Sequence, residues 1–154
     1  MDKDIYFMEK ALQYAREAAL CGEVPIGAVI VKDGEVISHG QNRRETNKNA
    51  LCHAEIEAIN SACRALGGWR LWQCELYVTL EPCPMCAGAI INARIPRVVF
   101  GAYDKKAGSC GSVVNLFSLP YNHKPELLGG VLEEECSALL SDFFKRIRVK
   151  KQTK

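Results

Sequence analysis

The first forty residues change from a helical to a strand-like spacing of apolar side chains. Between Asp4 and Cys21 the apolar positions fall on one face of a helix, and Gly22 can end that helix. Ile26 to Val31 is rich in β-branched residues, which predicts a strand. Asp33-Gly34 is a hairpin turn signal, so we expect Glu35 to Gly40 to return as the antiparallel partner.

Two helix–strand alternations follow a polar segment, Asn42 to Leu51, that is typical of a loop. Apolar residues at helical spacing predict a helix from His53 to Leu66, closed by Gly67-Gly68. Cys74 to Leu80 predicts a strand. Pro84 to Ala93 predicts a short helix that is so apolar that we expect it to be buried.

The last third of the chain is less regular. Arg97 to Gly101 predicts a strand, but Ala102 to Pro125 is a long irregular stretch, and such loops in compact domains are usually functional. Gly129 to Leu132 predicts a last edge strand. Acids come first and bases last between Glu133 and Val149, as the dipole of a final helix favours. The expected core face of that helix is Cys136, Leu139, Leu140, Phe143 and Ile147.

A hairpin followed by helix–strand units predicts an α/β fold, a three-layer α/β/α sandwich with a central mixed five-stranded sheet covered by helices. The chain shows no repeat and no low-complexity linker, and 154 residues suffice for one domain with its own core. We therefore expect a single domain over residues 1–154, with a basic C-terminal helix at about 133–149 and a tail at 150–154.

Composition narrows the class of protein. Hydrophobic residues make up 48% of the chain and charged residues 25%, an ordinary balance for a globular protein. The start, Met1-Asp2-Lys3-Asp4, is charged and has no apolar run behind it, so we expect no secretory signal, and no apolar stretch approaches a membrane span. We expect a cytoplasmic protein with no membrane partner, whose eight cysteines remain thiols.

The net charge of +2 is too small for the whole chain to bind polyanions in a generic way. The bases are concentrated in two places, however. Arg43, Arg44 and Lys48 form one cluster, and the segment from Asp142 to Lys154 holds six bases and one acid. Two interpretations remain open, a solvated helix end and contact with phosphates.

His53-Ala54-Glu55 and Pro82-Cys83-Pro84-Met85-Cys86 together contain three good zinc ligands and one carboxylate. Catalytic zinc sites use three protein ligands and leave the fourth position for water. Residues two apart on a helix do not face each other, so His53 and Glu55 cannot both bind a metal on the helix flank. We predict zinc, one per chain, on His53, Cys83 and Cys86, with Glu55 free to move protons. Cys83 precedes a helix whose dipole lowers thiol pKa values, so we expect both cysteines to deprotonate easily.

Two other interpretations of the cysteine pair do not involve a catalytic zinc ion. A closed structural zinc site needs a fourth ligand, which Cys52 or another cysteine could supply. A redox pair is the other reading of a Cys-x-x-Cys motif. The structural site leaves Glu55 and the paired helix starts unexplained, and the redox pair gives no role to Pro82 or to the upstream His-x-Glu. We therefore favour the catalytic site.

With those residues placed, the chain resembles the cytidine deaminase superfamily, whose zinc signature is H-x-E…P-C-x-x-C, and within it the bacterial tRNA-specific adenosine deaminase family. The resemblance extends over nearly the whole chain. The segments that carry it are Val24-Pro25-Ile26-Gly27-Ala28, His53-Ala54-Glu55, Leu80 through Cys86 to Ala89, Ala93-Arg94-Ile95, Asp104 to Gly108, Gly111-Ser112, Asn122-His123 and Asp142-Phe143-Phe144. The zinc motif indicates the superfamily, and the later segments indicate the tRNA family.

The resemblance implies conversion of adenosine to inosine at the wobble position of a transfer RNA anticodon, with an arginine tRNA bearing ACG as the expected substrate. It implies a homodimer, zinc, and Glu55 as the residue that transfers protons. It also implies five substrate contacts: Asn42 on the purine edge, Ile26 lining the pocket, the Ala54 backbone touching the base, and Asp104 and Lys106 near the flanking nucleotides, within reach of the partner subunit's site. Asn42 could instead be a turn residue, and Ile26 a core residue.

The last helix offers a platform for unstacked anticodon bases, formed by Phe144, Arg146 and Arg148, although Phe144 could also belong to the core. Two other functions remain open. A deaminase of free bases or nucleosides, such as guanine or cytosine, would share the zinc motif and the fold. A noncatalytic zinc or RNA-binding module would keep the scaffold but has no use for Glu55. We expect no binding to DNA.

Overall fold

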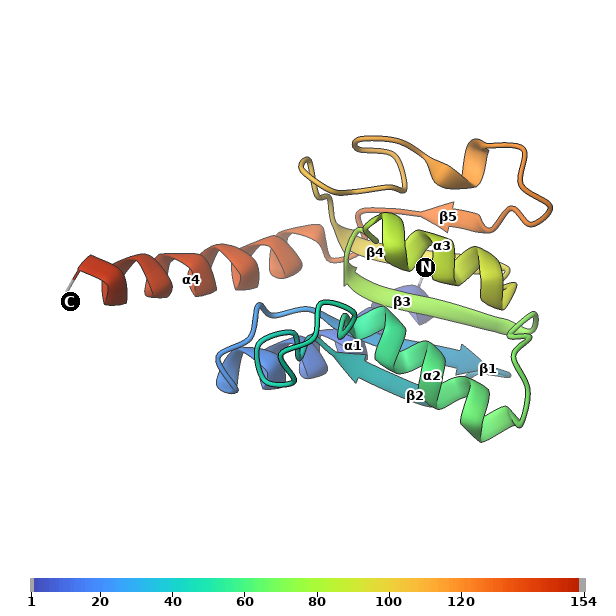
Figure 1. Cartoon of the computed structure of the whole chain (residues 1–154), viewed down its shortest axis with the longest axis horizontal. Coiled ribbons are helices and arrows are strands. Elements are labelled where there is room, and N and C mark those ends of the chain that lie inside the picture. The colour runs from blue at the N-terminus through green and yellow to red at the C-terminus, as the bar shows by residue number, and fades with distance from the viewer. Residues whose placement is uncertain (1, 153–154) are drawn as a thin grey trace.

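The computed structural model describes residues 2–152 and contains a five-stranded sheet in the order β2-β1-β3-β4-β5 (Figure 1). β1 runs antiparallel to β2 and β3, whereas β3, β4 and β5 are parallel to one another. The predicted mixed sheet of five strands is therefore confirmed. The strands are β1 (Gly27–Lys32), β2 (Glu35–Gln41), β3 (Cys74–Leu80), β4 (Arg97–Ala102) and β5 (Glu126–Leu128).

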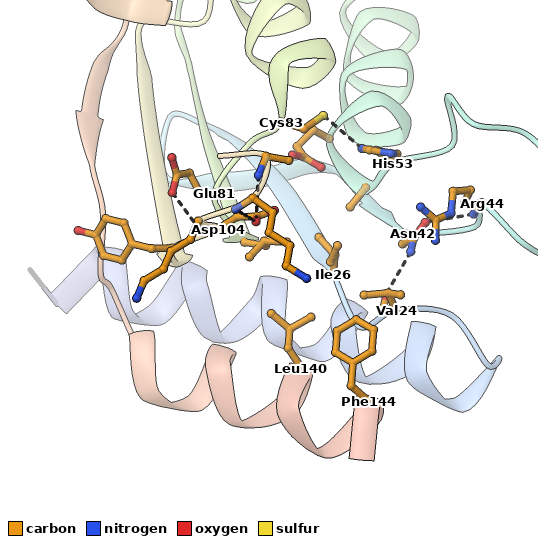
Figure 2. Close-up of a pocket in the computed structure, with 17 residues that line it drawn as sticks. Val24, Ile26, Asn42, Arg44, His53, Glu81, Cys83, Asp104, Leu140 and Phe144 are labelled. Carbon is orange, nitrogen blue, oxygen red and sulfur yellow. Dashed lines mark hydrogen bonds between the residues drawn. The ribbon is translucent and has the colours of Figure 1, made fainter. Parts of the chain in front are cut away.

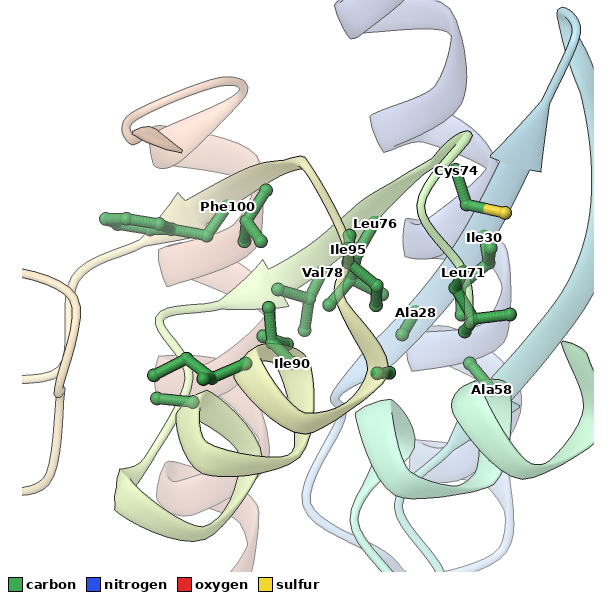
Figure 3. Close-up of a cluster of buried hydrophobic side chains, with 14 of the residues drawn as sticks. Ala28, Ile30, Ala58, Leu71, Cys74, Leu76, Val78, Ile90, Ile95 and Phe100 are labelled. Atoms are coloured by element: carbon green, nitrogen blue, oxygen red, sulfur yellow. The ribbon is translucent and has the colours of Figure 1, made fainter. Parts of the chain in front are cut away.

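Helices cover both faces of this sheet, as the sequence predicts (Figure 1). Alternate residues of β1 show the two layers. Ala28 and Ile30 pack with α2 and α3 (Figure 3), while Val29 and Val31 pack with α1 and α4. Strands covered on both sides carry few polar residues, which explains the apolar runs. The helices are α1 (Asp2–Leu20), α2 (Ala54–Leu66), α3 (Pro84–Ala93) and α4 (Glu133–Gln152). None of the helices in residues 2–152 combines the length and the apolar character needed to cross a bilayer.

Residues that favour turns or end helices explain several boundaries of the helices and strands. Asp33 and Gly34 both have positive φ, 53° and 76°, as a tight hairpin turn requires. Gly67 ends α2 in the left-handed conformation with φ 70°. The irregular stretch after β4 contains one short 3-10 helix, Leu116–Ser118, within the apolar patch.

The predicted strand at Gly129 to Leu132 is wrong. The edge strand is β5, Glu126–Leu128, and the chain then turns into α4. Gly130 and Leu132 have φ values of 89° and 53°, which no strand residue adopts. The backbone N–H groups of Gly130 and Val131 both donate to the carbonyl oxygen of Phe100, which curls the segment over the end of the sheet.

The last helix also differs from its predicted bounds. It begins at Glu133 as expected but continues to Gln152, so residues 150–152 of the predicted tail are helical, and residues 153–154 lie outside the described part of the chain. Cys136 and Phe143 of the expected core face are buried, whereas Leu139, Leu140 and Ile147 are half-buried. Figure 1 shows the reason, because α4 extends well beyond the edge of the sheet on which its first turns pack.

The start of α2 is held close to β2 because Gly40 has no side chain. A Cβ at Gly40 would lie 2.2 Å from the Ala54 carbonyl oxygen and 2.8 Å from the Ala58 nitrogen. Two residues earlier, the Ser38 hydroxyl donates to the Ala58 carbonyl oxygen at 2.8 Å. These contacts fix the first turns of α2 on the sheet and thereby fix His53, which precedes the helix.

A buried ionic network joins α1 to the strands at the end of the sheet opposite the carboxyl ends of β3 and β4. Asp4 is 3% exposed. Its carboxylate accepts two hydrogen bonds from Arg97, at 2.8 and 2.9 Å, and one from the Tyr77 hydroxyl at 2.7 Å. Arg97 also donates to Glu75 at 2.6 Å. The hydrogen bonds from Arg97 lower the pKa of Asp4 from 3.8 to about 2, against the opposing effect of burial.

Replacing Asp4 with asparagine is expected to lower the free energy of unfolding by about 3 kcal/mol at neutral pH, because Arg97 loses its bidentate partner. The pKa of Asp4 is lower in the folded state than in the unfolded state, so its contribution is complete above about pH 4 and disappears as the pH falls toward 2. Urea unfolding from pH 7 to pH 2.5 measures this. A stability difference between the two proteins that does not change with pH would contradict the assignment.

Candidate metal centre and substrate cavity

Two helices begin side by side where β3 ends, and each is preceded by a candidate ligand. His53 is the N-cap of α2, and Cys83 is the N-cap of α3, with Pro84 in the first helical turn. N-cap side chains usually bond to their own helix, but neither of these does. Both are extended in backbone conformation and are free to face each other, as Figure 2 shows.

The three predicted ligands lie together. His53 Nδ1 is 3.6 Å from Cys83 Sγ and 3.6 Å from Cys86 Sγ, and the three atoms all lie within 4.8 Å of one another. In tetrahedral zinc coordination, bond lengths of about 2.05 Å to nitrogen and about 2.3 Å to sulfur place these atoms about 3.6 Å apart. The donor types and their spacing therefore fit zinc.

Among residues 2–152, one group of histidine, cysteine and acidic side chains is close enough to hold a metal. Its three members are His53, Cys83 and Cys86. Cys52, the alternative fourth ligand, is not part of it and instead accepts a hydrogen bond from Asn47 Nδ2 at 3.5 Å. Glu55 is also outside the group. This arrangement favours an open catalytic site over a closed structural one.

In the metal-free site the two cysteines differ in acidity, and the expectation that both deprotonate when they bind a metal stays a prediction. The Cys86 thiol donates to Cys83, and this hydrogen bond, with His53 nearby, lowers the pKa of Cys83 to about 4. The same hydrogen bond, together with burial, raises the pKa of Cys86 far above its usual value. The pair shares one proton, which a metal must displace in order to bind both sulfurs.

Glu55 is only 4% exposed, one residue into α2. Burial raises its pKa to about 7, and the nearby negative charge of Cys83 acts in the same direction. A carboxyl group with a pKa near neutral can accept and donate a proton at physiological pH. Its burial and acidity suit the proton transfer that the sequence analysis assigns to it, and that role stays a prediction.

A cavity of about 590 Å³ opens beside this group (Figure 2). Its size is in the range usual for ligand sites. It brings together His53, Cys83 and Glu55 with all five residues for which the sequence resemblance implied substrate contacts: Ile26, Asn42, Ala54, Asp104 and Lys106. Asp104 and Lys106 line the cavity of their own chain. Cys86 lies deeper, buried beneath the site.

Asn42 sits in the cavity wall with its amide held in a fixed orientation. Its Oδ1 accepts a hydrogen bond from the Arg44 backbone N–H at 3.1 Å, and its Nδ2 donates to the Val24 carbonyl oxygen at 3.3 Å. A side-chain amide has four hydrogen-bonding positions, so positions remain on both atoms for a ligand. Asn42 thus stabilises the turn and also lines the cavity, and its contact with the purine edge stays a prediction.

Several lining residues were not predicted as site residues. Leu140 was assigned to the core and Arg44 only to a basic cluster. Phe144, which the sequence analysis placed in a platform for anticodon bases, is 44% exposed and lines the cavity beside Leu140 (Figure 2). The sequence carries no local signal for the others, because they come from segments that meet only in the folded chain. These others are Val24, Leu80, Glu81, Tyr103, Lys105 and Ala107.

The known proteins that this chain resembles are deaminases. Residues 1–148 match the family model of MafB19-like deaminases. The tRNA-specific adenosine deaminase of Bacillus subtilis (strain 168) is 50% identical over 153 residues, covering 99% of this chain and 95% of that protein. The enzyme of the same name from Aquifex aeolicus (strain VF5) is 49% identical over 144 residues, covering 93% and 95%. A solved structure from a study of A-to-I editing by tRNA:A34 deaminases at the wobble position is 49% identical, with a TM-score of 0.85, and the match covers 88% of this chain and 99% of that one.

Proposed function

The chain belongs to the family of tRNA-specific adenosine deaminases, and from this premise we propose that it converts adenosine to inosine at the wobble position of a transfer RNA anticodon. The observation that carries the proposal is the buried carboxyl of Glu55 beside a three-membered metal-binding group, at the wall of a cavity large enough for a nucleoside. We propose an arginine tRNA with the anticodon ACG as the substrate, in the cytoplasm.

His53, Cys83 and Cys86 would hold one zinc ion, which when bound would lower the pKa of water and make hydroxide available near neutral pH. Glu55 takes a proton from the attacking water and passes it to the purine ring nitrogen. It then takes the second proton from the hydroxyl that has added to the purine carbon and delivers it to the amino group, which leaves as ammonia as the carbon–nitrogen bond breaks and the carbon–oxygen double bond forms. The near-neutral pKa of Glu55 supports this double role.

The cavity wall supplies recognition of the base. Asn42 uses its remaining hydrogen-bonding positions on the purine edge, Ile26 packs against the ring, and the Ala54 backbone contacts the base. Asp104 and Lys106 lie farther along the same wall and contact the flanking nucleotides. An anticodon loop suits such a site because its bases can be turned out of the stack at low cost. We propose that the working unit is a homodimer.

Incubation of the zinc-loaded protein with unmodified ACG arginine tRNA, followed by nucleoside analysis, tests the proposal. Inosine is expected at the wobble position alone, and a matched tRNA with guanosine there should yield none. If no inosine forms while each chain holds one zinc ion, the activity is that of a small-molecule deaminase, and ammonia release from guanine, cytosine and adenosine then identifies the substrate.

The projecting part of α4 carries the bases that we propose contact the RNA backbone. Arg146 and Arg148 are exposed there, beyond Phe144 at the cavity rim. Replacing both with glutamate is expected to weaken tRNA binding by more than about tenfold at low salt and to flatten its salt dependence by about two phosphate contacts. Fluorescence anisotropy across a salt series measures both effects.

The matched control reverses two bases at the opposite end of the sheet. Arg64 lies in the last turn of α2, remote from His53, and Lys124 lies just before β5. Replacing both with glutamate changes the net charge by the same amount. If the two double variants weaken binding equally, overall charge and not α4 is responsible.

A further inference from the structure

Glu81 is a buried carboxylate between β3 and the cysteine motif, and it is 2% exposed. Its Oε1 accepts hydrogen bonds from the Asp104 backbone N–H at 3.0 Å and from the Ser112 hydroxyl at 2.5 Å. Its Oε2 accepts from the backbone N–H groups of Cys110 at 3.1 Å and Ser112 at 3.0 Å. All four donors belong to residues 104–112, here called the cavity loop. One side chain thus holds both ends of that loop, and Figure 2 shows Glu81 beside Asp104 at one of these ends.

The cavity loop is also fitted closely around this carboxylate. A Cβ at Gly108 would lie 2.3 Å from Glu81 Cδ, so the loop backbone passes directly over the carboxyl group. The Ser109 N–H donates to the Pro82 carbonyl oxygen at 2.8 Å, next to the metal-binding motif. The loop is therefore positioned from residues 81–82, which immediately precede Cys83.

The cavity loop forms one wall of the cavity with Asp104, Lys105, Lys106 and Ala107. Asp104 Oδ1 accepts hydrogen bonds from the Lys106 and Ala107 backbone N–H groups at 3.0 and 3.2 Å, so this turn keeps its shape as a unit. The bond from the Asp104 N–H to Glu81 places one end of this turn relative to Cys83, and the bond from the Ser109 N–H to the Pro82 carbonyl oxygen holds the chain just beyond the turn. Loss of the Asp104 bond therefore releases one end of the turn.

We propose that Glu81 is a positioning residue for RNA binding, which places the Asp104–Lys106 turn against the nucleotides that flank the edited base. This inference rests on the proposed function. The four hydrogen bonds that Glu81 accepts all come from the cavity loop, so it acts through that loop. It links the segment that carries Cys83 to the wall that receives the flanking nucleotides, so that the edited base and its neighbours are held in register.

Replacing Glu81 with glutamine tests this role specifically, because glutamine keeps the shape of the side chain and replaces one hydrogen-bond acceptor with a donor. An amide nitrogen at the Oε2 position would face two backbone N–H groups that cannot turn away. The amide will therefore place its nitrogen at the Oε1 position, where the Ser112 hydroxyl can rotate to accept. Only the Asp104 N–H then loses its acceptor. E81Q thus frees the end of the loop that carries the proposed RNA contacts and keeps the Cys110 and Ser112 end in place.

For the zinc-loaded E81Q protein we expect the KM for an ACG anticodon stem-loop to rise about tenfold, the scale of one lost charge-assisted hydrogen bond, with kcat reduced less than about threefold. Zinc content should stay at that of the wild type. A K106A substitution should weaken binding in the wild type and have little further effect in E81Q, because the turn is already displaced.

D4N is the matched control, since it also neutralises a buried carboxylate but lies in the network at the other end of the sheet. It should lower stability without changing KM. G108A, which presses on Glu81 from the loop side, should reproduce the E81Q phenotype. An unchanged KM in E81Q, additive effects of E81Q and K106A, or loss of zinc would each overturn the proposal. Absence of inosine in the wild type would instead count against the proposed function.

Discussion

Replacing Glu55 with alanine is expected to lower kcat by about 10³-fold or more, while zinc stays bound at the wild-type level and the fold stays intact. Positioned proton transfer alone contributes about 10²- to 10⁴-fold to a rate, and in our proposal Glu55 acts twice in each turnover. The fold should tolerate the change, because Glu55 is buried at a cavity wall and its charged form is disfavoured there. Inosine formation, metal analysis and thermal unfolding on the same preparations measure the three quantities.

E55Q is the matched variant, because glutamine keeps the volume and polarity but cannot carry a proton. It should lose as much activity as E55A. If E55Q retained substantial activity, Glu55 would serve to shape the cavity and another group would transfer the proton. If zinc were lost from either variant, Glu55 would be a ligand and its assigned role would be wrong.

Replacing Cys83 with serine is expected to lower zinc affinity by more than about a hundredfold, and activity should fall with zinc content. Mutation of residues that only support metal ligands already costs about 10- to 100-fold, so loss of a ligand should cost more. Metal analysis after dialysis against a weak chelator measures the affinity.

C52S is the control for this experiment, since Cys52 is adjacent to His53 in sequence but lies outside the metal-binding group. It should bind zinc as the wild type does. Zinc loss in C52S comparable to that in C83S would revive the closed structural site with four ligands. In the wild type, a strong chelator should abolish activity and added Zn²⁺ should restore it.

The features that the sequence predicted well are those determined by neighbours in the chain. Pro84 marks the start of α3 and Gly67 the end of α2, and each acts through its own backbone geometry. The two metal-binding motifs each lie at a helix start, so their meeting follows from the predicted layers. The strand predicted at Gly129 to Leu132 failed because its apolar residues suit a strand, whereas hydrogen bonds to Phe100, remote in sequence, impose left-handed conformations.

Sequence reasoning missed Glu81 and Leu140 for the same reason. Nothing local distinguishes a glutamate between a strand and a cysteine motif from a surface acid, and its four donors arrive from residues 23 to 31 positions later. Leu140 has the spacing of a core residue and does pack against the core, but it also lines the cavity. Such roles depend on which distant segments converge, and hydrophobic periodicity does not encode that.

The part of α4 beyond Phe143 affects how cooperatively the protein unfolds. Beyond Phe143 the described part of this helix, through Gln152, contains no buried side chain. Isolated helices shorter than about 12 residues are marginal in water, and repulsion between Arg146 and Lys150, four residues apart, disfavours this one further. Amide protons in these turns should therefore exchange with solvent long before the core opens. A bound polyanion reduces this repulsion and should order the end of the helix. The cost of that ordering lowers the net free energy of binding. The helical circular dichroism signal should therefore increase as RNA is added.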